Sequence, residues 1–80
     1  MSKQDIMKLD DTIQKEIIQQ YEYIRQSGLT NMFDYTSVKF IAKRLKFIAL
    51  YDFIKESFDN YKTILLNFGK LMKKFDIKQN

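Results

Sequence analysis

The chain has 80 residues, which is enough for one small domain with one hydrophobic core. Apolar residues make up 45% of it and aromatic residues 15%, which excludes the disordered class for most of the chain. Cys and His are absent, so a disulfide framework, thiolate chemistry and a histidine general base are excluded. Residues 1–36 hold four basic and six acidic side chains, whereas residues 37–80 hold ten basic and four acidic ones.

The first predicted helix ends at Gln26 and begins at either Lys3 or Asp11. Ser2 would cap the early start, and Asp10 or Asp11 would cap the later one. Apolar residues recur at three- and four-residue steps on one face, namely Ile6, Leu9, Ile13, Ile17, Tyr21 and Ile24. Gly28 can adopt the left-handed conformation that ends such a helix.

A short connection follows, in which the side chains of Met32 and Phe33 are expected to pack into the core. The second helix is predicted from Tyr35 or Thr36 to Leu45, and the third from Phe47 to Ser57. Their apolar faces nearly agree in angle across Lys46, so one bent helix is an open alternative to two separate ones. The apolar face of the second helix comprises Val38, Ile41, Ala42 and Leu45, and that of the third comprises Phe47, Leu50, Tyr51, Ile54 and Phe58.

The fourth helix is predicted to start after an Asp59–Asn60 cap, and its apolar stripe runs from Tyr61 to Phe75. Gly69 inside this stripe indicates either close packing against a neighbour or a tolerated defect. No segment shows the alternation of apolar and polar residues that is typical of a β-strand. The sequence therefore predicts an all-α fold, a compact array of three to four short helices in one domain over residues 1–80, with residues 1–5 and 77–80 frayed.

Catalytic patterns are lacking. Asp10 and Asp11 are the one adjacent pair of carboxylates, and neighbours on a helix diverge by about 100°. Most Ser and Thr residues fall at predicted helix ends, where capping explains them. There is no Gly-rich phosphate loop, zinc spacing or calcium loop. We therefore expect no enzyme activity, no cofactor and no metal.

The sequence also lacks the features of a membrane protein. No apolar run approaches the roughly 18 residues of a membrane span. The first nine residues have no continuous apolar stretch, so they do not resemble a signal peptide. We therefore expect a cytoplasmic protein without membrane association.

Basic residues cluster in two places along the chain. Lys39, Lys43 and Lys46 share one side of the second helix with Arg44 beside them, and Lys70, Lys73 and Lys74 lie near the end of the fourth. If the two groups are adjacent in space, they form a surface for nucleic acid or for an acidic partner. The alternative is an ordinary solvated helix face. Specific reading of DNA by the third helix is disfavoured because that helix presents Asp52 and Glu56.

Some apolar residues lie off the predicted core faces. Phe33, Phe40 and Phe47 project in roughly the same direction, opposite the core face of the second helix. Three further residues, Ile48, Phe53 and Leu66, also lie off their main faces. Either the second helix is buried on two sides, or a surplus apolar face contacts a partner protein or a second copy of the chain.

The run Ile24 to Asp34, IRQSGLTNMFD, is distinctive, above all the TNMFD motif from Thr30 to Asp34. It resembles a family of short phage and prophage proteins of Gram-positive bacteria, the domain of unknown function 5049. The resemblance continues through Val38, Ile41–Ala42, Phe53–Ile54 and Tyr61, and covers about residues 24–66. Lys46 departs from it, because the family pattern has Gly before the Phe at position 47.

The resemblance implies a phage accessory protein and carries over no site residues. With the absence of catalytic patterns, it leads us to expect a non-catalytic binding protein that antagonises a host defence or another host protein, in the manner of an anti-CRISPR. The alternative is a nucleic-acid-binding or transcriptional accessory protein that uses the basic face of the second helix. A packaging helper that merely self-associates is the third possibility.

Overall fold

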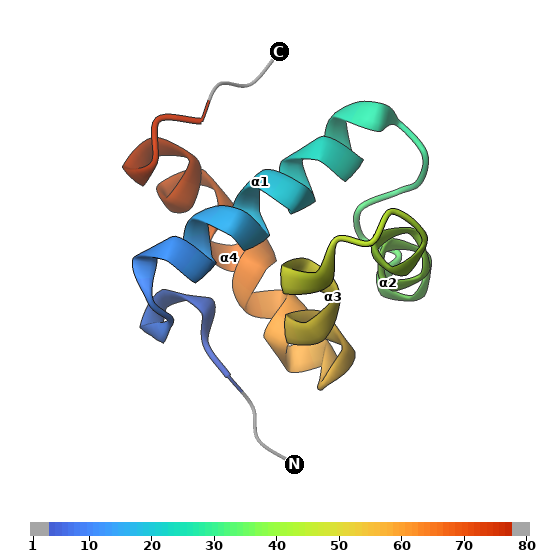
Figure 1. Ribbon diagram of the computed structural model, residues 1–80, viewed down its shortest axis with the longest axis horizontal. Coiled ribbons are helices and arrows are strands. Elements are labelled where there is room, and N and C mark those ends of the chain that lie inside the picture. Colours follow the sequence, from blue (N-terminus) through green and yellow to red (C-terminus); the bar gives the residue numbers. More distant parts are fainter. Residues whose placement is uncertain (1–3, 78–80) are drawn as a thin grey trace.

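The computed structural model describes residues 4–77, and in that range it contains one 3-10 helix, four α-helices and no strand (Figure 1). The predicted all-α array of short helices is therefore confirmed. The elements in chain order are η1 (Ile6–Lys8), α1 (Asp11–Ser27), α2 (Tyr35–Arg44), α3 (Ile48–Lys55) and α4 (Phe58–Lys74). No helix among the described residues is both long enough and apolar enough to cross a membrane.

Short polar side chains set where the helices begin. Asp10 caps α1 and Asp34 caps α2, each accepting a hydrogen bond from a backbone N–H in the first turn. Helix α1 thus has the later of its two predicted starts, because η1 and an extended Leu9 separate it from the first residues. The predicted Asp59–Asn60 cap of α4 is wrong. Ser57 caps that helix instead, and Asn60 is fully buried inside it.

Helices α2 and α3 are separate, which settles the open alternative at Lys46. Lys46 has a positive φ of 60°, in the left-handed region. Its N–H donates to the Lys43 carbonyl at 3.1 Å, and the Phe47 N–H donates to the Ala42 carbonyl at 2.9 Å. This pair of bonds is the usual left-handed helix ending, which glycine favours. Lys46 therefore adopts a backbone conformation that residues with a Cβ rarely take.

The start of α3 depends on another helix. Phe47, its N-cap residue, makes no capping hydrogen bond through its side chain. Instead the Gln20 side-chain oxygen of α1 accepts from the Leu50 N–H at 2.9 Å. Since helix starts leave backbone N–H groups without partners inside the helix, this contact both satisfies one of them and fixes α3 against α1.

Helix α1 crosses in front of α4 in the view of Figure 1, α3 lies beside them, and α2 stands at the edge of the molecule. The core lies between α1, α3 and α4, with Ile6 of η1 closing one end. Helix α2 adds only Val38 and Ala42 to the fully buried residues, and its other residues are half-buried or exposed. The largest fully buried apolar side chains are Tyr61, Ile6, Ile17, Ile18, Ile24, Leu50, Ile54, Ile64, Leu71 and Val38.

Every buried side-chain nitrogen and oxygen atom of the described residues has a hydrogen-bond partner. Asn60 donates to the Phe53 carbonyl at 2.8 Å and accepts from the Gln4 N–H at 2.7 Å. The Tyr61 hydroxyl donates to the Met32 carbonyl, and the Tyr35 hydroxyl donates to the Ile54 carbonyl at 2.5 Å. Burial raises the pKa of Tyr61 above its ordinary value, so its hydroxyl stays protonated and can donate.

Several predicted positions differ from the structure. Met32 packs against the core as expected, but Phe33 is 80% exposed, because the turn that holds Met32 inward directs its neighbour outward. Phe53, placed off the main face of its helix, is buried. A side chain at Gly69 would meet nothing within 4 Å, so this glycine is a tolerated defect and does not mark close packing.

The expected fraying of the chain ends falls mostly on residues 1–3 and 78–80, which lie outside the described residues. At the described margins, the Gln4 N–H donates to Asn60. Ile77 packs against the core, and its N–H donates to the Met72 carbonyl at 2.9 Å.

Candidate interaction surface

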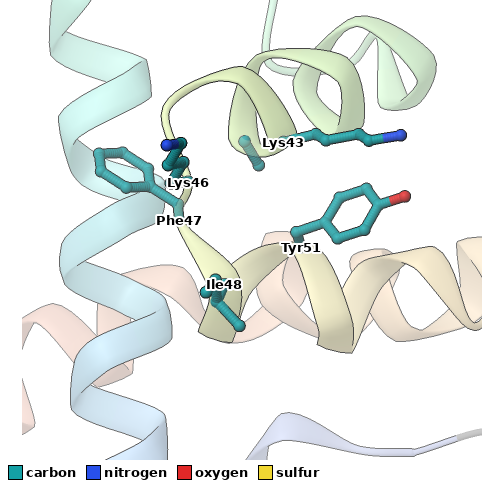
Figure 2. Close-up of a pocket in the computed structure, with 6 residues that line it drawn as sticks. Lys43, Lys46, Phe47, Ile48 and Tyr51 are labelled. Carbon is teal, nitrogen blue, oxygen red and sulfur yellow. The ribbon is translucent and has the colours of Figure 1, made fainter.

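An open apolar hollow of about 140 Å³ lies where α2 ends and α3 begins (Figure 2). It is called the α2–α3 hollow here. Ala42 and Lys43 of α2, Lys46 and Phe47 of the turn, and Ile48 and Tyr51 of α3 line it. Only three residues, 45–47, separate α2 from α3, so the adjoining ends of the two helices lie close together around the hollow.

The side chains around this hollow point in different directions (Figure 2). Phe47 points toward α1, where its ring meets Tyr23 edge-on at 5.4 Å between centroids. Ile48 is 65% exposed although it is a large apolar residue. The Nζ atoms of Lys43 and Lys55 lie 6.0 and 5.6 Å from the centre of the Tyr51 ring. The result is an apolar surface with cations at its rim.

A second open hollow, of about 450 Å³, flanks α2 on its other side. Leu29 of the loop after α1 lines it together with Phe40, Ile41, Arg44 and Leu45 of α2 and its end. The Arg44 guanidinium lies 5.8 Å from the centre of the exposed Phe40 ring. Helix α2 is therefore flanked by an apolar hollow on each of two sides.

The two predicted basic groups do not form one surface. Lys39, Lys43, Arg44 and Lys46 lie on or just after α2, at the right edge of Figure 1, whereas the end of α4 lies at the upper left. The Lys74 ammonium is 2.8 Å from an Asp11 carboxylate oxygen and 2.8 Å from the Gln14 side-chain oxygen, so it ties α4 to α1. The other basic residues of α4, Lys70 and Lys73, are exposed on that helix.

The α2 group keeps its charge available. None of the ion pairs among residues 4–77 involves Lys39, Lys43, Arg44 or Lys46. The Lys39 ammonium lies 4.9 Å from the centre of the Tyr35 ring, and Lys43, Arg44 and Lys46 are exposed. Four cations that join no ion pair within residues 4–77 lie along one helix and its end, and they give a local positive field that attracts anionic groups.

The predicted aromatic face is also wrong as a single surface. Phe40 is 59% exposed and borders the second hollow, whereas Phe47 is half-buried and lines the α2–α3 hollow. Phe33 lines neither of these two hollows. The three residues align only if the helical phase of α2 continues through Lys46, and the left-handed turn at Lys46 breaks that phase.

Two lining residues were missed as members of a site. Tyr51 was placed on the core face of its helix, yet it is only half-buried and forms a wall of the α2–α3 hollow. For Ile48, the one sign of a surface role in the sequence is its position off the predicted core face of its helix. Ala42 is a buried core residue that also lines the hollow.

A third hollow, of about 380 Å³, lies between the N-terminal turn, α1 and α3. Its lining includes Ile13 and two carboxylates, Glu16 of α1 and Asp52 of α3. Asp52 pairs with Lys55 at 3.3 Å. Helix α3 therefore borders an acidic hollow through Ala49 and Asp52, and the basic α2–α3 hollow through Ile48 and Tyr51.

One carboxylate, that of Glu22, is buried near the end of α1. Glu22 is buried and accepts hydrogen bonds from the Arg25 Nε at 2.7 Å and the Gln26 Nε2 at 2.6 Å. Burial raises the pKa of this carboxyl, but the bonds from Arg25 and Gln26 outweigh burial and hold it below its ordinary value. Arg25 also lies 5.3 Å from the centre of the Phe68 ring, so the cluster joins α1 to α4.

Metal ligands do not gather in the part of the chain that the structure describes. No group of three or more acidic residues among residues 4–77 has the geometry to hold an ion. Asp10 and Asp11, the adjacent carboxylates in the sequence, are used separately, since Asp10 caps α1 and Asp11 pairs with Lys74. The described residues offer instead two hollows beside α2 with cations around them, and the acidic hollow between α1 and α3.

Comparison with known proteins gives a family. Searches of curated proteins and of solved structures found no match. A family model described as "Domain of unknown function (DUF5049)" matches residues 10–67, a range that includes α1, α2, α3 and the α2–α3 hollow, and ends before Lys70. Because this match covers well over half of the chain, the protein belongs to the DUF5049 family.

Proposed function

We propose that this protein is a non-catalytic binding protein that occupies a surface of a partner protein through the α2–α3 hollow and the cations beside it. The observation that carries the proposal is an open apolar hollow next to an exposed Ile48, with Lys43 and Lys46 at its rim. Exposed apolar groups next to charged ones are typical of protein interfaces.

The biological version of this proposal is a phage accessory protein that blocks a host protein, such as an effector of CRISPR defence. It is supported by the small size of the chain and by the lack of His and Cys. The resemblance of the TNMFD run to phage and prophage proteins supports it further. A protein that acts by occupying a surface needs a stable scaffold and an exposed contact area, and α2 and α3 provide both.

A two-fold dimer through the same surface is disfavoured by charge. Symmetric pairing would place Lys43 and Lys46 of one copy near the same residues of the other, because such an interface is self-complementary. Like charges brought together at an interface cost free energy. We therefore propose that the partner at this surface is a different protein, acting in the cytoplasm of the host cell.

A photo-crosslinking experiment tests the proposal. A photoreactive phenylalanine analogue is placed at Ile48 or, as the control, at Leu66, which is 80% exposed on α4 and lines none of the hollows described above. In the host cell, the analogue at Ile48 should give a discrete product with a second protein, and the analogue at Leu66 should not. Equal labelling from both positions, or none, would contradict the proposal.

The proposal that the protein blocks a host defence predicts a phenotype. Expression of the chain in a bacterium with an active CRISPR system should restore plaque formation by a targeted phage. Ile48→Asp should abolish the effect and Leu66→Asp should retain it, since both exchanges add the same charge to an exposed apolar position. Unchanged immunity with the wild-type chain would remove this version while leaving the general proposal open to crosslinking.

The alternative is a nucleic-acid-binding accessory protein, and one observation favours it. Lys39, Lys43, Arg44 and Lys46 remain together and outside the ion pairs of the described residues. Contacts to phosphates by four cations would make the affinity for duplex DNA or RNA fall steeply as salt rises. A gel-shift series in increasing salt tests this, and no shift at low salt would exclude it.

A further inference from the structure

We infer that the α2–α3 hollow binds a short acidic segment of the partner through one large apolar side chain. The inserted side chain enters between Phe47, Ile48 and Tyr51, and flanking carboxylates face Lys43 and Lys46. This inference rests on the proposed function and names the chemistry of its partner.

The size and lining of the hollow fit one apolar side chain. Its volume is about 140 Å³, and an apolar cavity of about 150 Å³ accommodates a benzene ring. Ala42 is small, and the rings of Phe47 and Tyr51 and the side chain of Ile48 provide apolar walls. A single inserted Phe or Leu would fill the hollow, and it would also cover part of Ile48.

The positive charge at the rim of the hollow determines which residues of the partner can flank the inserted side chain. The ammonium groups of Lys43 and Lys46 take part in none of the ion pairs of residues 4–77. Lys39 and Arg44 extend the positive field along α2. Complementary charge speeds encounter and rejects partners of the wrong sign, so the segment that binds here carries carboxylates.

The same residues argue against two other occupants. A nucleic acid would contact the cations of α2 through its phosphates and would not need the apolar hollow beside them. A second copy could present its acidic hollow, but Asp52 of that hollow is already paired with Lys55. An apolar side chain flanked by carboxylates uses the hollow and its cations together.

A nuclear magnetic resonance titration of the isotope-labelled chain tests the inference. The probe is the capped peptide Glu-Glu-Phe-Glu-Glu, with Lys-Lys-Phe-Lys-Lys and Glu-Glu-Ala-Glu-Glu as matched controls for charge and for the apolar insert. We expect shifts of backbone amide signals centred on residues 42–51, with a Kd of about 1 mM. The alanine peptide should bind at least about fivefold more weakly, since it lacks the buried ring.

Two variants of the protein with a reversed charge complete the test, one at the rim of the hollow and one away from it as the control. Lys43→Glu should weaken binding of the acidic peptide about fivefold, and Lys70→Glu, which makes the same change on exposed α4, should alter it less than about twofold. Circular dichroism of both variants verifies that the helices are kept. Equal weakening by the two reversals would show a non-specific charge effect and would overturn the inference.

Other outcomes also overturn it. They are an absence of shifts with the acidic Phe peptide, equal binding of the basic peptide, or a short DNA duplex that shifts the same signals at lower concentration. Concentration-dependent shifts at Ile13, Glu16 and Ile48 without any peptide would assign the hollow to a second copy. If crosslinking at Ile48 still captures a protein while the peptide fails, the proposed function stands and only the acidic chemistry of its partner is wrong.

Discussion

The junction between α3 and α4 and the junction between α2 and α3 are built in opposite ways. At the first, Asn60 and Tyr61 are fully buried and bonded to the backbone of distant segments. At the second, backbone hydrogen bonds at Lys46 make the turn, and Ile48 remains exposed. Buried side-chain hydrogen bonds thus hold the first junction, whereas the second leaves apolar surface exposed, which is where we propose that a partner binds.

The largest effect is expected at Asn60. In Asn60→Ala, the Phe53 carbonyl and the Gln4 N–H both lose their buried partner, which should lower the free energy of unfolding by about 3 kcal/mol. Urea denaturation followed by circular dichroism measures the loss. A cost below about 1 kcal/mol would show that the α3–α4 junction is not the more strongly stabilised of the two.

The Glu22 cluster extends the comparison to the contact between α1 and α4. Because the pKa of Glu22 is lowered in the folded protein, its bonds to Arg25 and Gln26 stabilise the fold at neutral pH. This contribution is complete above the ordinary glutamate pKa of about 4.3 and disappears as the pH falls through the lower folded value.

Glu22→Gln should therefore cost about 1.5 kcal/mol at pH 7 and have little effect in strong acid. Thermal unfolding of both proteins between neutral and acidic pH provides the measurement. A constant difference across the whole range would show that the ionised carboxylate is not the stabilising species.

At the α2–α3 junction, the exchange Lys46→Gly should increase stability. The left-handed conformation costs a residue with a Cβ about 1–2 kcal/mol, and glycine avoids that cost. After the loss of chain entropy by glycine, we expect a gain of about 1 kcal/mol. Lys46→Ala is the control, because it removes the side chain but keeps the Cβ, and it should change stability little.

Gly69 offers the reverse exchange on α4. It lies inside the helix, and a Cβ added there meets nothing within 4 Å, so Gly69→Ala should stabilise the protein by about 0.8 kcal/mol. The same denaturation series would detect this gain. Loss of stability would mean that α4 approaches another element more closely at this position than the structure shows.

The smallest effect on stability is expected at Ile48. Its side chain is mostly exposed, so Ile48→Ser should change the free energy of unfolding by less than about 0.5 kcal/mol while removing an apolar contact at the hollow. Binding measured alongside stability separates the two roles. A large loss of stability would indicate that the hollow belongs to the core and is not a recognition surface.

Helical periodicity in the sequence is enough to predict the all-α class, α1, α4 and most of the core faces, but it leaves open whether α2 and α3 are one bent helix or two. Apolar spacing places Ile17, Ile24, Val38, Leu50 and Ile64 where the structure buries them, because helical periodicity is local. Gly28 was correctly identified as the left-handed end of α1, since glycine carries its own conformational signal. At the candidate surface, Lys43, Lys46 and Phe47 were named in advance, and all three line the hollow.

The remaining features depend on how the helices pack against one another. The tertiary structure separates the basic residues of α2 from those of α4, uses Lys74 to hold α1, and directs Phe33 outward while Phe53 turns inward. It also replaces a local cap of α3 with Gln20 from α1, and uses Asn60 as a buried bridge. These outcomes depend on which helix surfaces meet, and the order of residues along the chain fixes side-chain directions only within each helix.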